Sequence, residues 1–212
     1  MGVFKGGLKS IKIELKACNV SVTGVNSAGL EGIQYTGSQS RTPQVSFKDG
    51  ALVITEKPAS GGRKGLAVSN MSLDIKISKD ADLRFLDIKL NSGDISVKDV
   101  SADWFSGIVG AGNITLTNSN FLKADLVTKA GNVNVSDTNL NKVKIDANAG
   151  SAKVDAVEPR DEYDIECNVK KGNVKIGNKS SSGKYKSKAG GKSSKNTDSI
   201  EINVNVGNIE IQ

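Results

Sequence analysis

The chain has 212 residues, of which 37% are hydrophobic and 4% aromatic, and it carries a formal net charge of +6 with no histidine. This size suits one all-β domain, and the small aliphatic composition is typical of stacked sheets. A chain without histidine excludes Ser-His and Cys-His nucleophile systems. Its two cysteines are too few for a disulfide framework. The sequence contains no run of about eighteen apolar residues, so no transmembrane helix is predicted.

The first half of the chain predicts strands arranged around two corners. Apolar residues at every second position precede and follow Cys18, which predicts a corner there and a buried thiol. The same alternation surrounds Gly50, between Val45 and Ile54, so a further corner is predicted at Gly50. Residues 56–67, which are rich in glycine and basic side chains, are predicted to form a loop that bulges from the body.

The second half is built on a repeat. A glycine recurs at spacings of 19, 19, 19, 22 and 35 residues, and apolar residues alternate on both sides of it. Period two predicts strands with one buried face, and the phase slips at each glycine, as it would at a corner. The glycines are Gly93, Gly112, Gly131, Gly150, Gly172 and Gly207.

Polar residues follow these glycines. Asparagine tolerates the left-handed backbone region, and its amide can bond to nearby backbone. We therefore expect the side chain of an asparagine in one coil to form a hydrogen bond to the next coil. The asparagines are Asn113, Asn132, Asn173 and Asn208.

The predicted fold is all-β: a parallel β-helix or β-solenoid whose coils of about 19–22 residues meet at Gly-Asn corners. A single coil buries too little apolar surface to offset its ordering entropy, so neighbours must stack on it. One domain is expected over residues 1–212. It is less regular over residues 1–92 and regular over residues 93–212, where a Lys/Ser/Gly-rich loop at residues 177–198 interrupts the stack.

The motifs of this repeat resemble those of a known family. The strand SLDIKIS at residues 72–78, the segment LDIKLNSGDISV at residues 86–97 and the repeated A-G-N-[IV]-x-[LV] units resemble the bacterial putative adhesin family. The resemblance covers nearly the whole chain. It implies a non-enzymatic binding or scaffold domain of envelope or surface proteins and brings no catalytic residues. The compartment stays open: the bacterial envelope by resemblance, or the cytoplasm if this chain is the full natural product.

One exposed strand face offers an alternative function. Asp125, Lys144, Asp146 and Glu166 are expected on it, and enzymes that act on acidic polysaccharides place such residues on a strand face. Alternating charge is more typical of a solvated, cross-strand-paired surface. We therefore predict no catalytic residue, metal ligand or cofactor, and keep a polysaccharide-active enzyme as the alternative.

Two further features predict partners. Residues 177–198 hold six lysines and one acid, so they carry five of the six net positive charges. These lysines are candidate ligands for an anionic envelope polymer, and the alternative is that the segment is a solubilising loop. The other candidate partner of the chain is a protein. Specific binding of nucleic acid is not predicted. The final strand, Asn208 to Gln212, lacks a cap, which predicts end-to-end self-association unless a loop covers its edge. The six lysines are Lys179, Lys184, Lys186, Lys188, Lys192 and Lys195.

Overall fold

The computed structural model describes residues 7–27, 29–56, 71–190 and 198–212. These residues form strands and two short 3-10 helices, η1 (Gln39–Arg41) and η2 (Arg160–Glu162), and none of their helices could span a membrane. The strands are β1 (Ser10–Ala17), β2 (Asn19–Val25), β3 (Leu30–Thr36), β4 (Gln44–Lys48), β5 (Ala51–Thr55), β6 (Ser72–Ser78), β7 (Leu83–Ser92), β8 (Ile95–Lys98), β9 (Ser101–Ala111), β10 (Ile114–Thr117), β11 (Asn120–Ala130), β12 (Val133–Ala149), β13 (Ala152–Ala156), β14 (Tyr163–Ile176), β15 (Lys179–Ser187), β16 (Asp198–Val206) and β17 (Ile209–Ile211).

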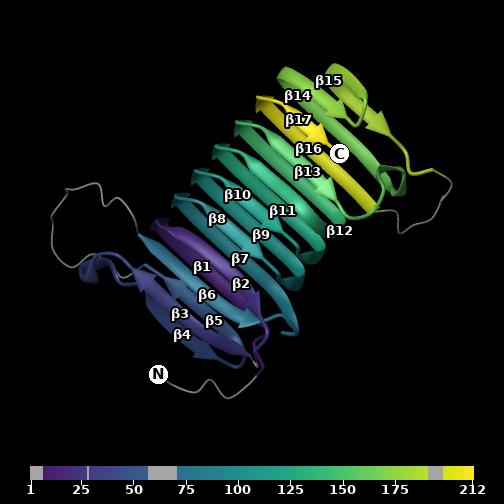
Figure 1. The fold of residues 1–212 in the computed structure, drawn as a ribbon. Helices are drawn as coiled ribbons and strands as arrows, with labels where there is room; N and C mark the ends of the chain where they lie inside the picture. Colours follow the sequence, from purple (N-terminus) through teal and green to yellow (C-terminus); the bar gives the residue numbers. More distant parts are fainter. Residues whose placement is uncertain (1–6, 28, 57–70, 191–197) are drawn as a thin grey trace.

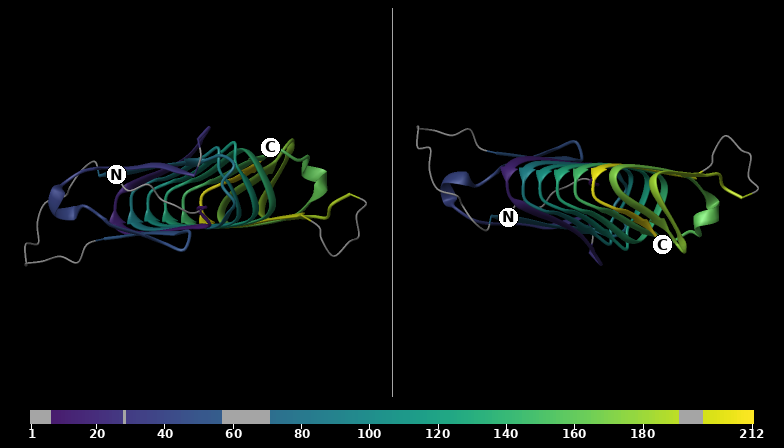
Figure 2. Two further views of the ribbon diagram at one scale, coloured as in Figure 1. Left: turned by 90° about the horizontal axis from the view of Figure 1, so that it is seen from below. Right: turned by 90° about the horizontal axis from the view of Figure 1, so that it is seen from above.

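The strands wind into stacked coils with two layers of strands around one core (Figures 1 and 2). Ile114 pairs in parallel with Ile95 on one side and with Val133 on the other, and Val133 pairs with Ala152. Residues nineteen apart therefore occupy equivalent places, as predicted. Their side chains belong to one buried apolar cluster that runs from Leu8 to Ile211. The prediction of an all-β, solenoid-like fold is confirmed.

We call the two layers the front sheet and the back sheet. The back sheet consists, in spatial order, of β3, β6, β2, β8, β10, the start of β12, β13, β17, the end of β14 and the start of β15. The front sheet consists of β4, β5, β1, β7, β9, β11, the end of β12, β16, the start of β14 and the end of β15.

The coils do not stack in chain order. The last coil, β16 and β17, lies between the coil that contains β13 and the coil formed by β14. At the other end, the first coil, β1 and β2, lies between the coil of β5 and β6 and the coil of β7 and β8. The first and last described coils are therefore inserted into the stack, and Figure 1 shows the yellow strands β16 and β17 beside the green strands β13 and β14.

This order corrects the prediction of an open edge at Asn208 to Gln212. Strand β17 pairs with β13 on one side and with β14 on the other, so it is internal. The outermost coil at that end is β14, and the antiparallel strand β15 covers both of its halves. The prediction of a loop over residues 177–198 was therefore wrong for Lys179–Ser187. A two-residue turn with Gly177 at a φ of 53° joins β14 to β15.

A second hairpin corrects the corner predicted at Gly50. Strand β4 pairs with β5 in antiparallel fashion, and Lys48 lies opposite Ala51. Asp49 and Gly50 form the connecting turn with φ values of 53° and 81°, as a tight hairpin requires. Strand β4 thus covers β5, and β3 covers β6, at the first end of the stack. Of the loop predicted at residues 56–67, residues 57–67 lie outside the described part of the chain.

The other predicted corner glycines stack directly over one another. Gly131 has a φ of 144°, and a Cβ atom placed on it would lie 1.9 Å from the backbone oxygen of Gly112. Only glycine allows the coils to approach this closely at the corner. The spatial order of the column is Cys18, Gly93, Gly112, Gly131, Gly150, Gly207 and Gly172.

A ladder of side-chain hydrogen bonds runs beside this column. The backbone N–H of Asn132 donates to Oδ1 of Asn113 at 2.9 Å, and the N–H of Ser151 donates to Oδ1 of Asn132 at 2.9 Å. The ladder continues through the inserted coil, because Asn208 N–H donates to Ser151 Oγ at 3.1 Å and Asn173 N–H donates to Asn208 Oδ1 at 3.0 Å. Each corner therefore satisfies backbone groups of the next one.

Candidate functional site

The outer surface of the front sheet presents ordered columns of side chains. In a strand, successive side chains point to opposite faces, so every second residue of each front strand lies on this surface. Parallel pairing in register then aligns these residues from coil to coil. The most highly charged column reads Lys12, Asp87, Ser106, Asp125, Lys144, Glu201 and Glu166.

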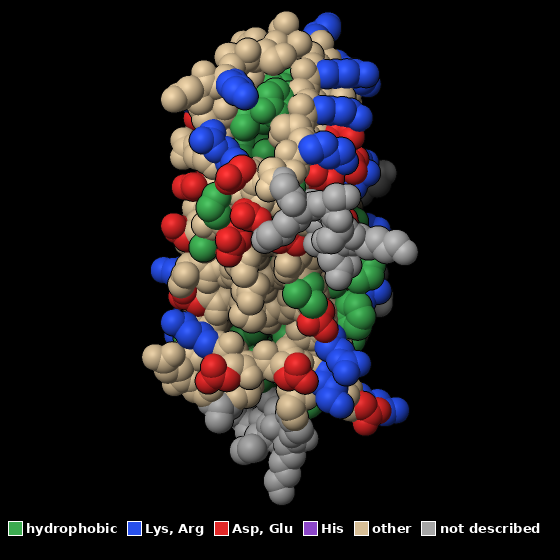
Figure 3. Space-filling model, turned by 90° about the vertical axis from the view of Figure 1, so that its right-hand side faces the viewer, with side chains coloured by type: hydrophobic (Ala, Val, Ile, Leu, Met, Phe, Trp, Pro, Cys, Tyr) green, Lys and Arg blue, Asp and Glu red, His purple; other side chains and the backbone are tan. Residues whose placement is uncertain are grey.

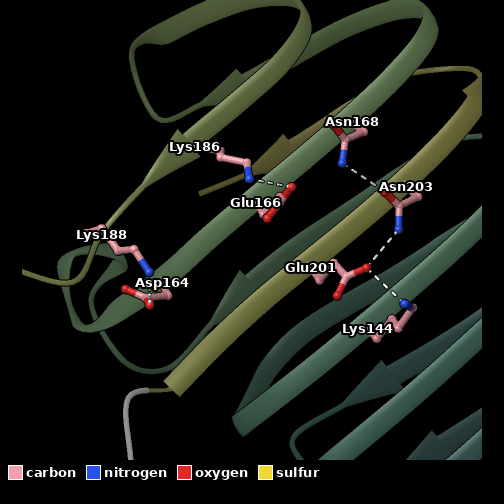
Figure 4. Close-up of polar contacts among 8 residues, drawn as sticks. All are labelled: Lys144, Asp164, Glu166, Asn168, Lys186, Lys188, Glu201 and Asn203. Atoms are coloured by element: carbon pink, nitrogen blue, oxygen red, sulfur yellow. Dashed lines mark hydrogen bonds and ion pairs between the residues drawn. The ribbon is translucent and has the colours of Figure 1, made fainter. Parts of the chain in front are cut away.

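The coil order separates Glu166 from the other residues of the enzymatic alternative. Asp125 pairs in register with Lys144, and Asp146 lies two residues further along β12. Lys144 and Glu166 are not neighbours, because Glu201 of β16 lies between them. Lys144 Nζ contacts Glu201 Oε1 at 2.9 Å, and Asn203 Nδ2 donates to Glu201 Oε1 at 3.1 Å (Figure 4). Asn203 Nδ2 also lies 2.9 Å from Asp146 Oδ1, to which it donates. These side chains form a polar network within the sheet surface.

Three carboxyl groups at this end of the front sheet have lowered pKa values. A hydrogen bond from Lys186 lowers the pKa of Glu166, and a hydrogen bond from Lys144 lowers the pKa of Glu201. The pKa of Asp164 is likewise lowered by hydrogen bonds from Lys188 and from the backbone N–H of Ala189. A general acid that works near neutral pH needs a raised carboxyl pKa, so these three groups are ion-pair partners and poor proton donors.

Of the four lysines that the structure describes in β15 and just after it, two form ion pairs and two do not. Lys186 Nζ lies 2.8 Å from Glu166 Oε1, and Lys188 Nζ lies 2.8 Å from Asp164 Oδ2 (Figure 4). These two lysines fasten β15 to the terminal coil. Lys179 and Lys184 are exposed and form no ion pair with a described residue. The two remaining candidate anion ligands, Lys192 and Lys195, lie outside the described residues.

The wider surface mixes charges of both signs. On the side shown in Figure 3, Lys and Arg side chains lie among Asp and Glu side chains. Across the described residues, no group of three or more Cys, Asp or Glu side chains is arranged to hold a metal ion. Cys167 lies in the core, where burial raises the pKa of its thiol to about 12. This thiol packs as an apolar side chain.

One feature of the front sheet was missed in the sequence. Phe85 and Trp104 are 49% and 39% exposed and lie side by side on β7 and β9. Their ring centroids are 6.0 Å apart, with an interplanar angle of 58°. The alternation could have revealed them, because Leu86 and Phe105 are buried and their preceding neighbours must therefore face outward. These rings border an open groove over β1, β7 and β9.

The chain matches a known family. The match to the Toastrack DUF4097 family extends over residues 5–212. The chain belongs to this family. That result agrees with the resemblance to putative bacterial adhesins seen in the motifs. None of the curated proteins matches the chain.

Two solved structures are similar to this chain. A putative cell adhesion protein from Clostridium sporogenes ATCC 15579 is 17% identical with a TM-score of 0.57, covering 97% of this chain and 93% of that one. A putative adhesin from Bacteroides fragilis NCTC 9343 is 15% identical with a TM-score of 0.49, covering 98% and 93% of the two chains. The first of these likenesses shows that the fold extends over both chains.

Proposed function

We propose that this Toastrack chain is a single, non-enzymatic, adhesin-like binding domain of the bacterial cell envelope, built as a parallel β-helix. Its partner is a protein or a polymer of the envelope, and it binds on the outer surface of the front sheet. The family membership and the fold shared with a putative cell adhesion protein support this proposal.

The pairing of charges on the front sheet carries the proposal. Lys144, Glu201 and Asp146 belong to one network, and Glu166 is paired with Lys186. Side chains that are paired with one another on a regular strand surface suit recognition, because their positions are set by the backbone register. The same pairing works against the enzymatic alternative, which requires a proton donor among these carboxylates.

A retention assay with a chemical readout tests this function. Purified protein is mixed with isolated bacterial cell-wall fragments, and both the bound protein and the sugar reducing ends in solution are measured. We expect saturable retention and no increase in reducing ends. Protease-treated fragments and fragments stripped of anionic polymer identify which class of partner is bound. Release of sugar fragments, or no retention on any preparation, would contradict the proposal.

Two matched variants locate the binding surface. Val127 of β11 lies on the outer surface of the front sheet, and Thr115 of β10 lies on that of the back sheet; both are partly exposed. Val127→Arg places a bulky cation on the front surface and is expected to weaken retention. Thr115→Arg adds the same group to the opposite surface and is expected to leave retention unchanged. Equal effects would argue against a front-sheet site.

A further inference from the structure

The groove beside Phe85 and Trp104 has the composition of a binding site. Its lining comes from three neighbouring front strands, β1, β7 and β9. The aromatic rings of Phe85 and Trp104 line one side of the groove. The ammonium, carboxylate and hydroxyl groups of Lys12, Asp87 and Ser106 line the other side. The lining residues include Ser10, Lys12, Phe85, Asp87, Trp104 and Ser106.

Strand register builds this arrangement from two adjacent columns. Ser10, Phe85 and Trp104 occupy one column of the outer surface. Lys12, Asp87 and Ser106 occupy the next column, two residues further along each strand. The small side chain of Ser10 leaves space beside the Phe85 ring. The groove spans two strand spacings, roughly 10 Å.

The indole of Trp104 is held in place before any ligand binds. Its Nε1 donates a hydrogen bond of 3.0 Å to Asp125 Oδ2, and Lys123 Nζ lies 4.6 Å from the ring centroid. Lys123 and Asp125 are themselves paired at 2.8 Å. A preorganised aromatic side chain loses little conformational entropy on binding, so more of the contact energy remains as affinity.

These exposed rings belong to a chain that is poor in aromatic residues. Trp104 is the sole tryptophan, and aromatic residues make up 4% of the sequence. Single exposed apolar residues are common on protein surfaces, whereas two aromatic rings in contact beside polar groups mark an interaction site.

We propose that this groove binds a short segment of uncharged glycan. The proposal rests on the binding function above and names a ligand class for it. A pyranose ring has an apolar C–H face that packs on an aromatic ring and a hydroxyl edge that bonds to Ser, Asp and Lys side chains. The lining carries one lysine and one aspartate, so its charges balance and favour a neutral ligand over a polyanion. A membrane-binding surface would need a wider apolar area.

The sole tryptophan provides a local probe for the test. Trp104 emission is followed while chitohexaose, cellohexaose or maltohexaose is added to the whole chain. We expect a saturable change in emission with at least one of these glycans. Phe85→Ala and Asp87→Ala are each expected to weaken that binding about tenfold, and both residues lie outside the core. Val157→Ala alters an exposed apolar residue that does not line the groove and is expected to leave binding unchanged.

The alternatives give different results. No change of emission with any of the three glycans, or equal affinity in Phe85→Ala, would overturn the proposal. A response to polygalacturonate or to phosphatidylcholine vesicles without a response to neutral glycans would overturn it in favour of an anionic polymer or a lipid. Cell-wall retention that is undiminished in Phe85→Ala would leave the binding function standing without this groove. Glycan binding without any cell-wall retention would instead contradict the envelope function alone.

Discussion

Lys144 and Glu201 form a 2.9 Å ion pair across 57 residues of sequence, because the last coil of the chain is inserted beside β12. The pair is half exposed, so its own contribution to stability is modest. The pair is informative because it shows the order in which the coils stack. The coil of β16 and β17 separates β12 from β14 and thereby decides which charges meet on the front sheet.

The corner column should be the least tolerant part of the stack. Gly131→Ala introduces a Cβ atom 1.9 Å from the Gly112 carbonyl oxygen at a φ of 144°. We expect it to lower the free energy of unfolding by about 3 kcal/mol or more. Gly32→Ala is the control, because nothing lies within 4 Å of a Cβ atom there, and a change below about 0.5 kcal/mol is expected. Urea unfolding measures both, and equal effects would contradict the close approach of coils.

The hydrogen-bond ladder should make a smaller contribution. Asn132→Ala removes the acceptor for the backbone N–H of Ser151 and should lower stability by about 1 kcal/mol. Asn132→Asp keeps an acceptor oxygen and should recover part of that loss. Asn134→Ala changes a side chain that forms no hydrogen bond to the described residues, so thermal unfolding should be unaffected. A loss in Asn134→Ala as large as in Asn132→Ala would argue against the ladder.

The cap formed by β15 should loosen in acid. The pKa values of Asp164 and Glu166 are lowered by the lysines that bond to them. Their contribution is thus fully present above the unfolded carboxyl pKa of about 4 and is lost as the pH falls through the lower folded values. Amide-exchange protection factors of Lys184–Ser187 should therefore drop as the pH falls below about 4, before those of the core strands.

Substitution of both carboxylates provides the control for this pH dependence. Asp164→Asn with Glu166→Gln should reduce protection of β15 at neutral pH and remove the acid transition there. A wild-type cap with constant protection down to about pH 2.5 would show that the ion pairs do not hold it.

The six lysines of residues 177–198 remain candidates for binding an anionic polymer. Lys186 and Lys188 are already paired with carboxylates. Of the four lysines that the structure describes, Lys179 and Lys184 should therefore contribute most of the affinity for an anionic polymer. Lys179→Gln with Lys184→Gln should weaken binding to teichoic acid and reduce the slope of its salt dependence by about one per lost contact. The matched pair Lys186→Gln with Lys188→Gln should change the slope less. The opposite ranking would contradict this assignment.

Much of the fold could be predicted because apolar alternation and the glycine spacing repeat in every coil. The coil order could not, because all coils present the same apolar columns and corner geometry, so the sequence pattern does not distinguish Ile209 from Val174 as the neighbour of Ala152; in the structure it is Ile209. The spacing of 35 before Gly207 was the available clue. A hairpin strand that caps the outermost coil forces the returning chain to pair on the inner side of that coil.

The missed local features each had a signal in the sequence. Asp49-Gly50 between apolar runs is typical of a hairpin turn, and its resemblance to the glycine corners concealed that. A second corner uses Asp99, Asn118 and Asp137, nineteen residues apart and all at positive φ, which Asp and Asn tolerate better than most residues. Phe85 and Trp104 lie nineteen residues apart, so the coil spacing together with the outward alternation was the signal that places them side by side.

Cross-linking of paired cysteines tests the coil order most directly. Neighbouring strands lie about 4.8 Å apart and strands two positions apart about 9.6 Å, while a disulfide needs Cα atoms within roughly 7 Å. Lys144→Cys with Glu201→Cys should form a disulfide under mild oxidation, whereas Lys144→Cys with Glu166→Cys should not. Efficient cross-linking of the second pair, and none of the first, would contradict the insertion of the last coil and the pattern of charges on the front sheet.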